Sequence, residues 1–126
     1  YTEIAISFSH LMSQNDLEKL GSMITDDFIF IIKGNPKVFS YSGTYNRQQF
    51  LDHLNIGFCD SKTTIVDTVT EGDKVAIELT VLGKFKTGPD YNGTYHWSFR
   101  FKGDKISELR NYSDTANSLF WKSQSK

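Results

Sequence analysis

The residues best suited to chemistry are a carboxylate near the end of the chain and two tyrosines in its middle. Asp114 follows a run of strand-forming residues. A carboxylate at the mouth of an apolar cavity loses solvation, so its pKa rises and it can exchange protons near neutral pH. Tyr41 and Tyr45 could each donate a hydrogen bond to a developing oxyanion. The plainer alternatives are that Asp114 caps the segment after it and that both tyrosines only pack.

Aromatic side chains form a second group of candidates. Five of them fall on faces that the hydrophobic pattern predicts to be buried: Phe28, Phe30, Phe50, Trp97 and Phe99. They could line a pocket for a flat, apolar ligand, and Tyr112 would join them if its strand presents it inward. The alternative is that these rings form an ordinary core.

The phase of the last strand decides which of its residues point inward. Ile106 and Leu109 are three residues apart, so simple alternation cannot bury both. Either a bulge intervenes or one of them faces solvent. Two alternatives follow for the inward pair: Tyr112 with Asp114, or Asn111 with Ser113.

Metal and nucleophile chemistry is not indicated. The three histidines, His10, His53 and His96, lack close metal-ligand spacing. Cys59 has no local nucleophile motif and suits a small buried residue. No glycine-rich phosphate loop follows a strand. We therefore expect no metal and no other cofactor.

The elements that must position these residues change character midway along the chain. Apolar residues at helical spacing predict a helix over 2–13. Asn15 and Asn46 are each followed three residues later by Glu or Gln, so each predicts a capping box at the start of a further helix. A dense β-branched and aromatic run over 28–32 predicts a buried strand, and we expect a short extended piece over 38–42.

From residue 61 the period of the apolar pattern becomes two. It predicts strands over 63–70, 75–81, 95–102 and 105–113, joined by short turns into an antiparallel meander. Bulges at glycines such as Gly83 would bend the sheet. The expected fold is α+β, with three N-terminal helices packed on the concave face of a strongly curved, mainly antiparallel sheet. Such a cone can hold a ligand.

Bulk composition narrows the classes of function. The 126 residues, 38% of them hydrophobic, predict one domain over 1–126 with a real core. The net charge of -1 provides no field to steer nucleic acid or an anionic membrane. No apolar run approaches the roughly 20 residues of a membrane span. A single cysteine excludes an internal disulfide and fits a cytoplasmic setting.

Three stretches carry a resemblance to a known family: 15–28, 41–50 and 99–114. In order and spacing they resemble the nuclear-transport-factor-2-like (ketosteroid isomerase-like) superfamily, and within it the SnoaL-like polyketide cyclase group. The resemblance covers nearly the whole chain and implies a cone-shaped fold. It also implies a role for Asp114, which matches the aspartate that serves as acid or base in SnoaL-type cyclases.

The sequence departs from the better-defined activities of that superfamily. A ketosteroid isomerase would have a carboxylate before the third helix, where 38–42 contains no acid. An epoxide hydrolase of this type would have Asp-x-Arg where this chain has Ser98 and Arg100. Some cyclases have a histidine where Val81 or Leu82 stands. Only the final aspartate matches.

Two functions remain after these exclusions. The first is a small-molecule binding protein or enzyme of SnoaL-like type, which isomerises or cyclises an apolar cyclic substrate by acid/base chemistry without a cofactor. The second is a non-catalytic ligand-binding or protein-interaction module that forms a homodimer through its outer sheet face. Polar residues mark that face: Glu78, Thr80, His96, Ser98 and Arg100.

Overall fold

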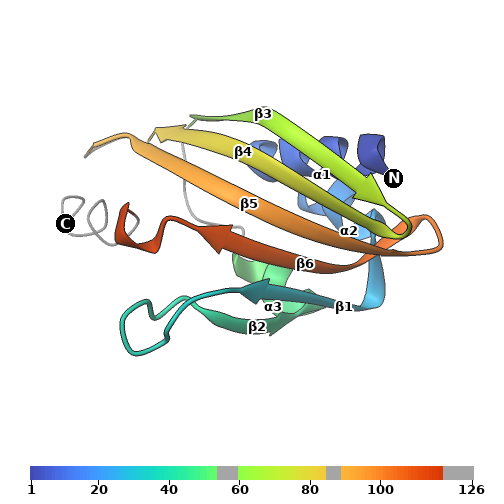
Figure 1. The fold of residues 1–126 in the computed structure, drawn as a ribbon. Coiled ribbons are helices and arrows are strands. Elements are labelled where there is room, and N and C mark those ends of the chain that lie inside the picture. The colour runs from blue at the N-terminus through green and yellow to red at the C-terminus, as the bar shows by residue number, and fades with distance from the viewer. Residues whose placement is uncertain (54–59, 85–88, 118–126) are drawn as a thin grey trace.

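The computed structural model describes residues 1–53, 60–84 and 89–117. In chain order the elements are α1 (Thr2–Gln14), α2 (Leu17–Ser22), β1 (Ile24–Ile32), β2 (Gly43–Asn46), α3 (Arg47–His53), β3 (Asp60–Glu71), β4 (Lys74–Lys84), β5 (Tyr91–Lys102) and β6 (Lys105–Ser113). The helices lie against one face of a curved six-stranded sheet with the strand order β2-β1-β6-β5-β4-β3 (Figure 1). The expected α+β fold is confirmed.

The first two helices are separated by a tight cap. Asn15 adopts a left-handed conformation with φ 59° and ends α1, which a short polar side chain tolerates well. Asp16 then caps α2, and its carboxylate accepts a hydrogen bond of 3.2 Å from the amide of Lys19. The predicted cap at Asn15 was therefore wrong by one residue, because Asn15 serves the preceding helix instead.

The predicted capping box of the third helix is confirmed. The backbone amide of Gln49 donates to Oδ1 of the Asn46 side chain, and the backbone amide of Asn46 donates to Oε1 of the Gln49 side chain, both at 2.9 Å. The expected extended piece over 38–42 was wrong, because residues 36–38 and 40–41 form turns and the short strand β2 begins at Gly43. The cap directly follows this strand, so β2 passes into α3 without a loop.

One strand pair joins the two halves of the chain. β1 pairs antiparallel with β2 and parallel with β6, so that Phe30 lies beside Leu109. All other strand pairs are antiparallel. In Figure 1 β1 and β2 form the lower edge of the sheet, with α3 behind them.

Two bulges set the inward faces of the strands. Arg100 pairs with Glu108 and Phe101 pairs with Ile106, which leaves Ser107 as an extra residue. A second bulge leaves Val66 unpaired in β3. At Gly83, where a bulge was expected, the pairing is regular instead. Bending by a bulge therefore depends on cross-strand register, which glycine alone does not reveal.

The core lies between α1, α3 and the inner face of the sheet. Phe50 of α3 is its hub, with ring centroids 4.9 Å from Phe30, 5.0 Å from Phe28 and 6.1 Å from Phe8. Phe8 also makes an edge contact with Phe99 of β5. These rings tie the helices to β1 and β5, which lie on either side of β6. Within the described residues, no helix combines the length and apolar character needed to cross a membrane.

Candidate functional site

The inner face of the sheet is apolar at one end and partly polar at the other. Val75, Phe99 and Ile106 are fully buried at the apolar end. Polar inward side chains gather at the opposite end, where β5 begins and β6 ends: Thr63, Tyr91, Tyr95, Trp97, Asn111 and Ser113. Burying polar groups has a free-energy cost unless they are hydrogen-bonded. This end of the interior, which we call the polar end, is therefore the candidate site.

Asn111 and Trp97 form a buried hydrogen-bonded pair at the polar end. They face each other across β5 and β6, and the indole Nε1–H donates to Oδ1 of Asn111 at 2.9 Å. Asn111 is 9% exposed and Trp97 is 5% exposed. The bulge at Ser107 produces this arrangement, because it lets Ile106 and Leu109 both face inward and then turns Asn111 inward as well. Of the two alternatives for the last strand, the structure thus shows Asn111 with Ser113.

Two tyrosines form a second hydrogen-bonded pair beside the first. The hydroxyl groups of Tyr91 and Tyr95 are hydrogen-bonded to each other, and the ring of Tyr91 lies over Gly93. The ring of Tyr95 in turn lies 5.9 Å from Trp97. Burial, followed by the effect of Tyr91, raises the pKa of the Tyr95 phenol well above its ordinary value. The Tyr95 phenol therefore stays neutral at physiological pH.

The sequence reasoning missed Tyr91 and Gly93. The signal was present, since Tyr91, Gly93 and Tyr95 alternate with exposed residues at period two. The expected strand began at Tyr95, four residues later than β5 does. A glycine inside a strand can mark a close approach of another group, and here that group is the Tyr91 ring.

Asp114 lies just beyond β6, and its side chain is exposed. Oδ1 accepts a hydrogen bond of 3.0 Å from the amide of Asn117, which is the capping role weighed above. Its own amide faces the carbonyl of Thr94 at 3.4 Å. The cap therefore fixes Asp114 near the polar end. Because Ser113 faces inward, the alternation along β6 turns the next residue, Asp114, outward. A proton-transfer role for Asp114 stays a prediction.

Tyr41 lies just before the edge strand β2 and Tyr45 lies within it, and β1 separates this strand from β6. The Tyr45 hydroxyl donates to the carbonyl of Tyr41 at 2.5 Å, and the Tyr45 ring packs 6.1 Å from Phe30. Tyr41 is exposed and makes an edge contact with Phe39. The Tyr45 proton is thus already used within the protein. A catalytic role for either tyrosine stays a prediction.

The aromatic candidates divide between the two faces of the sheet. Five lie inside and are nearly or fully buried: Phe28, Phe30, Phe50, Trp97 and Phe99. Their rings contact one another or other core rings, and Trp97 alone combines this with a polar partner. Tyr112 is 44% exposed and lies on the outer face, which corrects the expectation that it lines the interior. The bulge at Ser107 is the reason, because it reverses the alternation from Glu108 onward and so turns Tyr112 outward.

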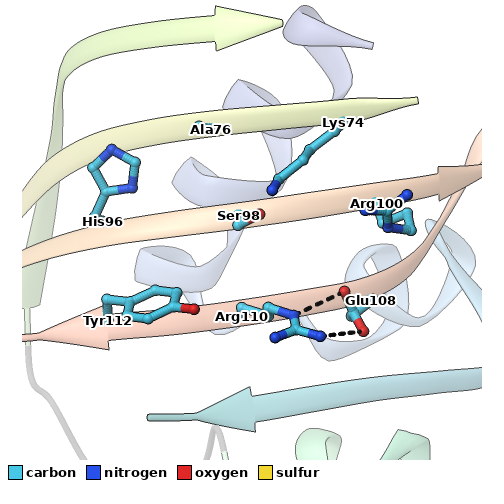
Figure 2. Close-up of a pocket in the computed structure, with 8 residues that line it drawn as sticks. All are labelled: Lys74, Ala76, His96, Ser98, Arg100, Glu108, Arg110 and Tyr112. Atoms are coloured by element: carbon cyan, nitrogen blue, oxygen red, sulfur yellow. Dashed lines mark hydrogen bonds and ion pairs between the residues drawn. The ribbon is translucent and has the colours of Figure 1, made fainter. Parts of the chain in front are cut away.

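The outer face carries a hollow of about 370 Å³. Figure 2 shows the eight residues that line it: Lys74, Ala76, His96, Ser98, Arg100, Glu108, Arg110 and Tyr112. The small side chains of Ala76 and Ser98 form its floor, and longer polar ones stand around them. Nε of Arg110 lies 3.1 Å from Glu108, and hydrogen bonding with that carboxylate raises the pKa of Arg110. His96 faces outward, as the alternation predicted.

The ionisable residues give no grouping suited to a metal. In the part of the chain that the structure describes, no three His, Cys, Asp or Glu side chains come together as metal ligands would. Cys59 and the apolar tail at 119–121 lie outside the described residues.

Two tight turns connect the long strands at the other end of the sheet. Gly72 closes the turn between β3 and β4, and Gly103 closes the turn between β5 and β6, each with a left-handed φ. These turns stand at the apolar end, away from the candidate site.

These features define a class: a curved sheet that wraps around helices, with polar and aromatic side chains gathered at one end of the interior. The model of the SnoaL-like domain family matches residues 5–109. The chain therefore belongs to the SnoaL-like domain family. A search of curated protein sequences gives no match.

Solved structures with the same fold cover almost the whole chain. TerC, co-crystallised with polyporic acid, shares 15% identity with a TM-score of 0.78, over 94% of this chain and 95% of its own. A protein with a ketosteroid isomerase-like fold from Catenulispora acidiphila DSM 44928, in complex with trimethylamine, shares 20% identity with a TM-score of 0.75, over 98% and 92%. IdmH from Streptomyces antibioticus, described as a candidate polyketide cyclase, shares 22% identity with a TM-score of 0.77, over 96% of each chain. At these identities the similarity shows the fold alone.

Proposed function

We propose that this protein binds a small, apolar, ring-containing molecule at the polar end of its interior. The observation that carries the proposal is the concentration of inward polar groups there, among aromatic rings, while Val75, Phe99 and Ile106 fill the other end. Ligand sites in proteins commonly combine an apolar lining with a few placed polar groups. The complexes of TerC with polyporic acid and of the Catenulispora protein with trimethylamine support a small molecule as the ligand.

The catalytic form of this proposal is acid/base isomerisation or cyclisation without a cofactor, with Asp114 as the acid or base. Membership of the SnoaL-like family and the position of Asp114 beside the polar end support it. Asparagine caps a helical turn as well as aspartate does. Asp114→Asn therefore removes proton transfer and keeps the cap to Asn117, which makes it a clean probe of chemistry.

A matched pair of variants tests the binding proposal. Ser113 faces inward at the polar end, and Thr94 lies outward on the neighbouring strand. Wild type, Ser113→Trp and Thr94→Trp are screened with a panel of ring compounds such as naphthalene, tetralin and 1-tetralone, by thermal unfolding. A free ligand concentration of 100 times the dissociation constant adds about 2.7 kcal/mol to the free energy of unfolding, which raises the melting temperature measurably.

We expect stabilisation of wild type and of Thr94→Trp, and none of Ser113→Trp, because an indole at position 113 fills the polar end. The proposal fails if no compound stabilises wild type, or if both tryptophan variants bind as wild type does. Asp114→Asn is assayed for binding beside them. Loss of turnover with retained binding supports the catalytic form, once a converted compound has been found.

The outer sheet face supports a second role, a homodimer. The hollow shown in Figure 2 lies on strands β4 to β6, on the side opposite to the helices. Small residues on its floor would admit side chains from a second copy, and the charged rim would allow paired contacts about a two-fold axis. Sedimentation velocity on wild type and Ala76→Glu tests this role. We expect a dimer that Ala76→Glu dissociates, and a monomeric wild type refutes it.

A further inference from the structure

The Asn111 carboxamide is held in one orientation by its partner. An indole N–H can only donate a hydrogen bond, so the atom it meets at 2.9 Å must be the amide oxygen. The amide nitrogen, Nδ2, then points away from Trp97. A side chain that could otherwise rotate by half a turn is thereby fixed with its two N–H donors on a known side.

Those two donors have no partner within the described part of the chain. The hydrogen bond recorded for the Asn111 side chain is the one from Trp97, at Oδ1. Two other polar atoms, Thr25 Oγ1 and Arg47 Nε, also lack a hydrogen-bond partner among the described residues, but they are fully enclosed, whereas Nδ2 is not. Asn111 is 9% exposed and its Nδ2 is not one of these enclosed atoms, so Nδ2 remains accessible. A nearly buried amide with unused donors is disfavoured unless a ligand or water completes it.

We propose that Nδ2 of Asn111 donates a hydrogen bond to an acceptor oxygen on the ring-containing ligand, and so selects ligands that carry a carbonyl or enolate-type oxygen. This inference rests on the binding site proposed above. Two further features at the polar end fit the same ligand class. The rings of Trp97 and Tyr95, with centroids 5.9 Å apart, offer apolar surface to a flat ring. The inward residues described there include no carboxylate that would repel the acceptor.

Asn111 is thus a specificity-determining residue and not an acid or base, because an amide exchanges no proton at neutral pH. Trp97 is a positioning residue that acts through it. Leucine at position 111 has similar volume and offers no donor. Phenylalanine at position 97 keeps the ring and removes the N–H, so the amide is free to turn its oxygen toward the ligand.

The test uses two probes of matched shape, 1-tetralone, which has a ring carbonyl, and tetralin, which has none. Dissociation constants for both are measured on wild type, Asn111→Leu and Trp97→Phe by ligand-detected NMR. The quantity compared is the ratio of the tetralin constant to the tetralone constant, because differences in hydration of the probes cancel between variants. We expect this ratio to fall about five- to tenfold in Asn111→Leu and by a smaller factor in Trp97→Phe.

A second readout needs no variant. In a ¹⁵N-labelled wild type, the side-chain NH₂ signals of Asn111 should shift on addition of tetralone and stay in place with tetralin. If both probes bind but the ratio is unchanged and the NH₂ signals do not move, the role of Asn111 is refuted and the binding site stands. If neither probe binds wild type, the binding site itself fails, and the role of Asn111 fails with it.

Discussion

Replacing Gly93 by alanine should displace Tyr91 and separate the two tyrosine hydroxyls. A Cβ at Gly93 would lie 2.5 Å from Oη of Tyr91, 2.6 Å from Cε2 and 2.7 Å from Cζ. Ordinary carbon contacts lie at about 3.5–4.0 Å, so the ring must move by about 1 Å or more. The backbone of Gly93 needs no left-handed φ. Space for the Tyr91 ring is therefore the reason for glycine here.

The size of the effect follows from what Tyr91 loses. Its ring is 8% exposed, and returning such a side chain to water costs about 1.5–3 kcal/mol. The lost hydroxyl hydrogen bond adds about 0.5–1.5 kcal/mol. Alanine in place of glycine within a strand stabilises the fold by about 0.5–1 kcal/mol, which offsets part of this loss. Gly93→Ala should therefore lower the free energy of unfolding by roughly 1–4 kcal/mol.

A double-mutant cycle separates this cause from a general intolerance of the site. Gly93→Ala is measured by urea denaturation in wild type and in Tyr91→Ala, where the ring is absent. In the second background the substitution should stabilise the protein by about 0.5 kcal/mol, so that the sign of the effect reverses. An equal loss of stability in both backgrounds would refute the reasoning, because the obstacle would then lie elsewhere.

Three further predictions concern the elements around the site. Asn46→Ala should lower the free energy of unfolding by about 1 kcal/mol because the Gln49 backbone amide loses its side-chain acceptor at position 46, whereas Asn46→Ser should keep most of the stability in the same urea assay. Phe50→Ala should cost roughly 3–5 kcal/mol in that assay, and Phe50→Leu less, because leucine leaves a smaller cavity among the rings. The raised pKa of Tyr95 stabilises the fold below the ordinary phenol value of 10.0, and this contribution declines as the pH rises above it. The unfolding midpoint of Tyr95→Phe should therefore fall less than that of wild type between pH 9 and about 11, and parallel declines would contradict a buried, neutral Tyr95.

Features determined by neighbouring residues were predictable from the sequence. The capping box at Asn46 involves residues three apart, and both hydrogen bonds form as expected. At Asn15 the same pattern misled, because asparagine also tolerates the left-handed conformation that ends a helix. The sequence did not reveal whether Asn15 would end α1 or begin α2.

The candidate site depended on register, which a single strand does not encode. One extra residue at Ser107 turns Asn111 inward and Tyr112 outward. The sequence showed that a choice existed, since Ile106 and Leu109 could not both be buried by alternation. Choosing between the outcomes required the pairing with β5. Asp114, which the resemblance emphasised, consequently lies beyond the strand as a cap, and Asn111 is the side chain that enters the interior.

The parallel pairing of β1 with β6 has a consequence for the order of assembly during synthesis. β1 leaves the ribosome early with β2 on one side, and its other edge has no neighbour until β6 emerges. An unsatisfied edge of that kind attracts other strands, so the nascent chain is exposed to mispairing during this interval. The same late strand carries Asn111, so the inward amide is among the last side chains to reach its place. A chaperone that shields β1 on the ribosome would therefore protect both the pairing of this strand and the placement of the Asn111 amide.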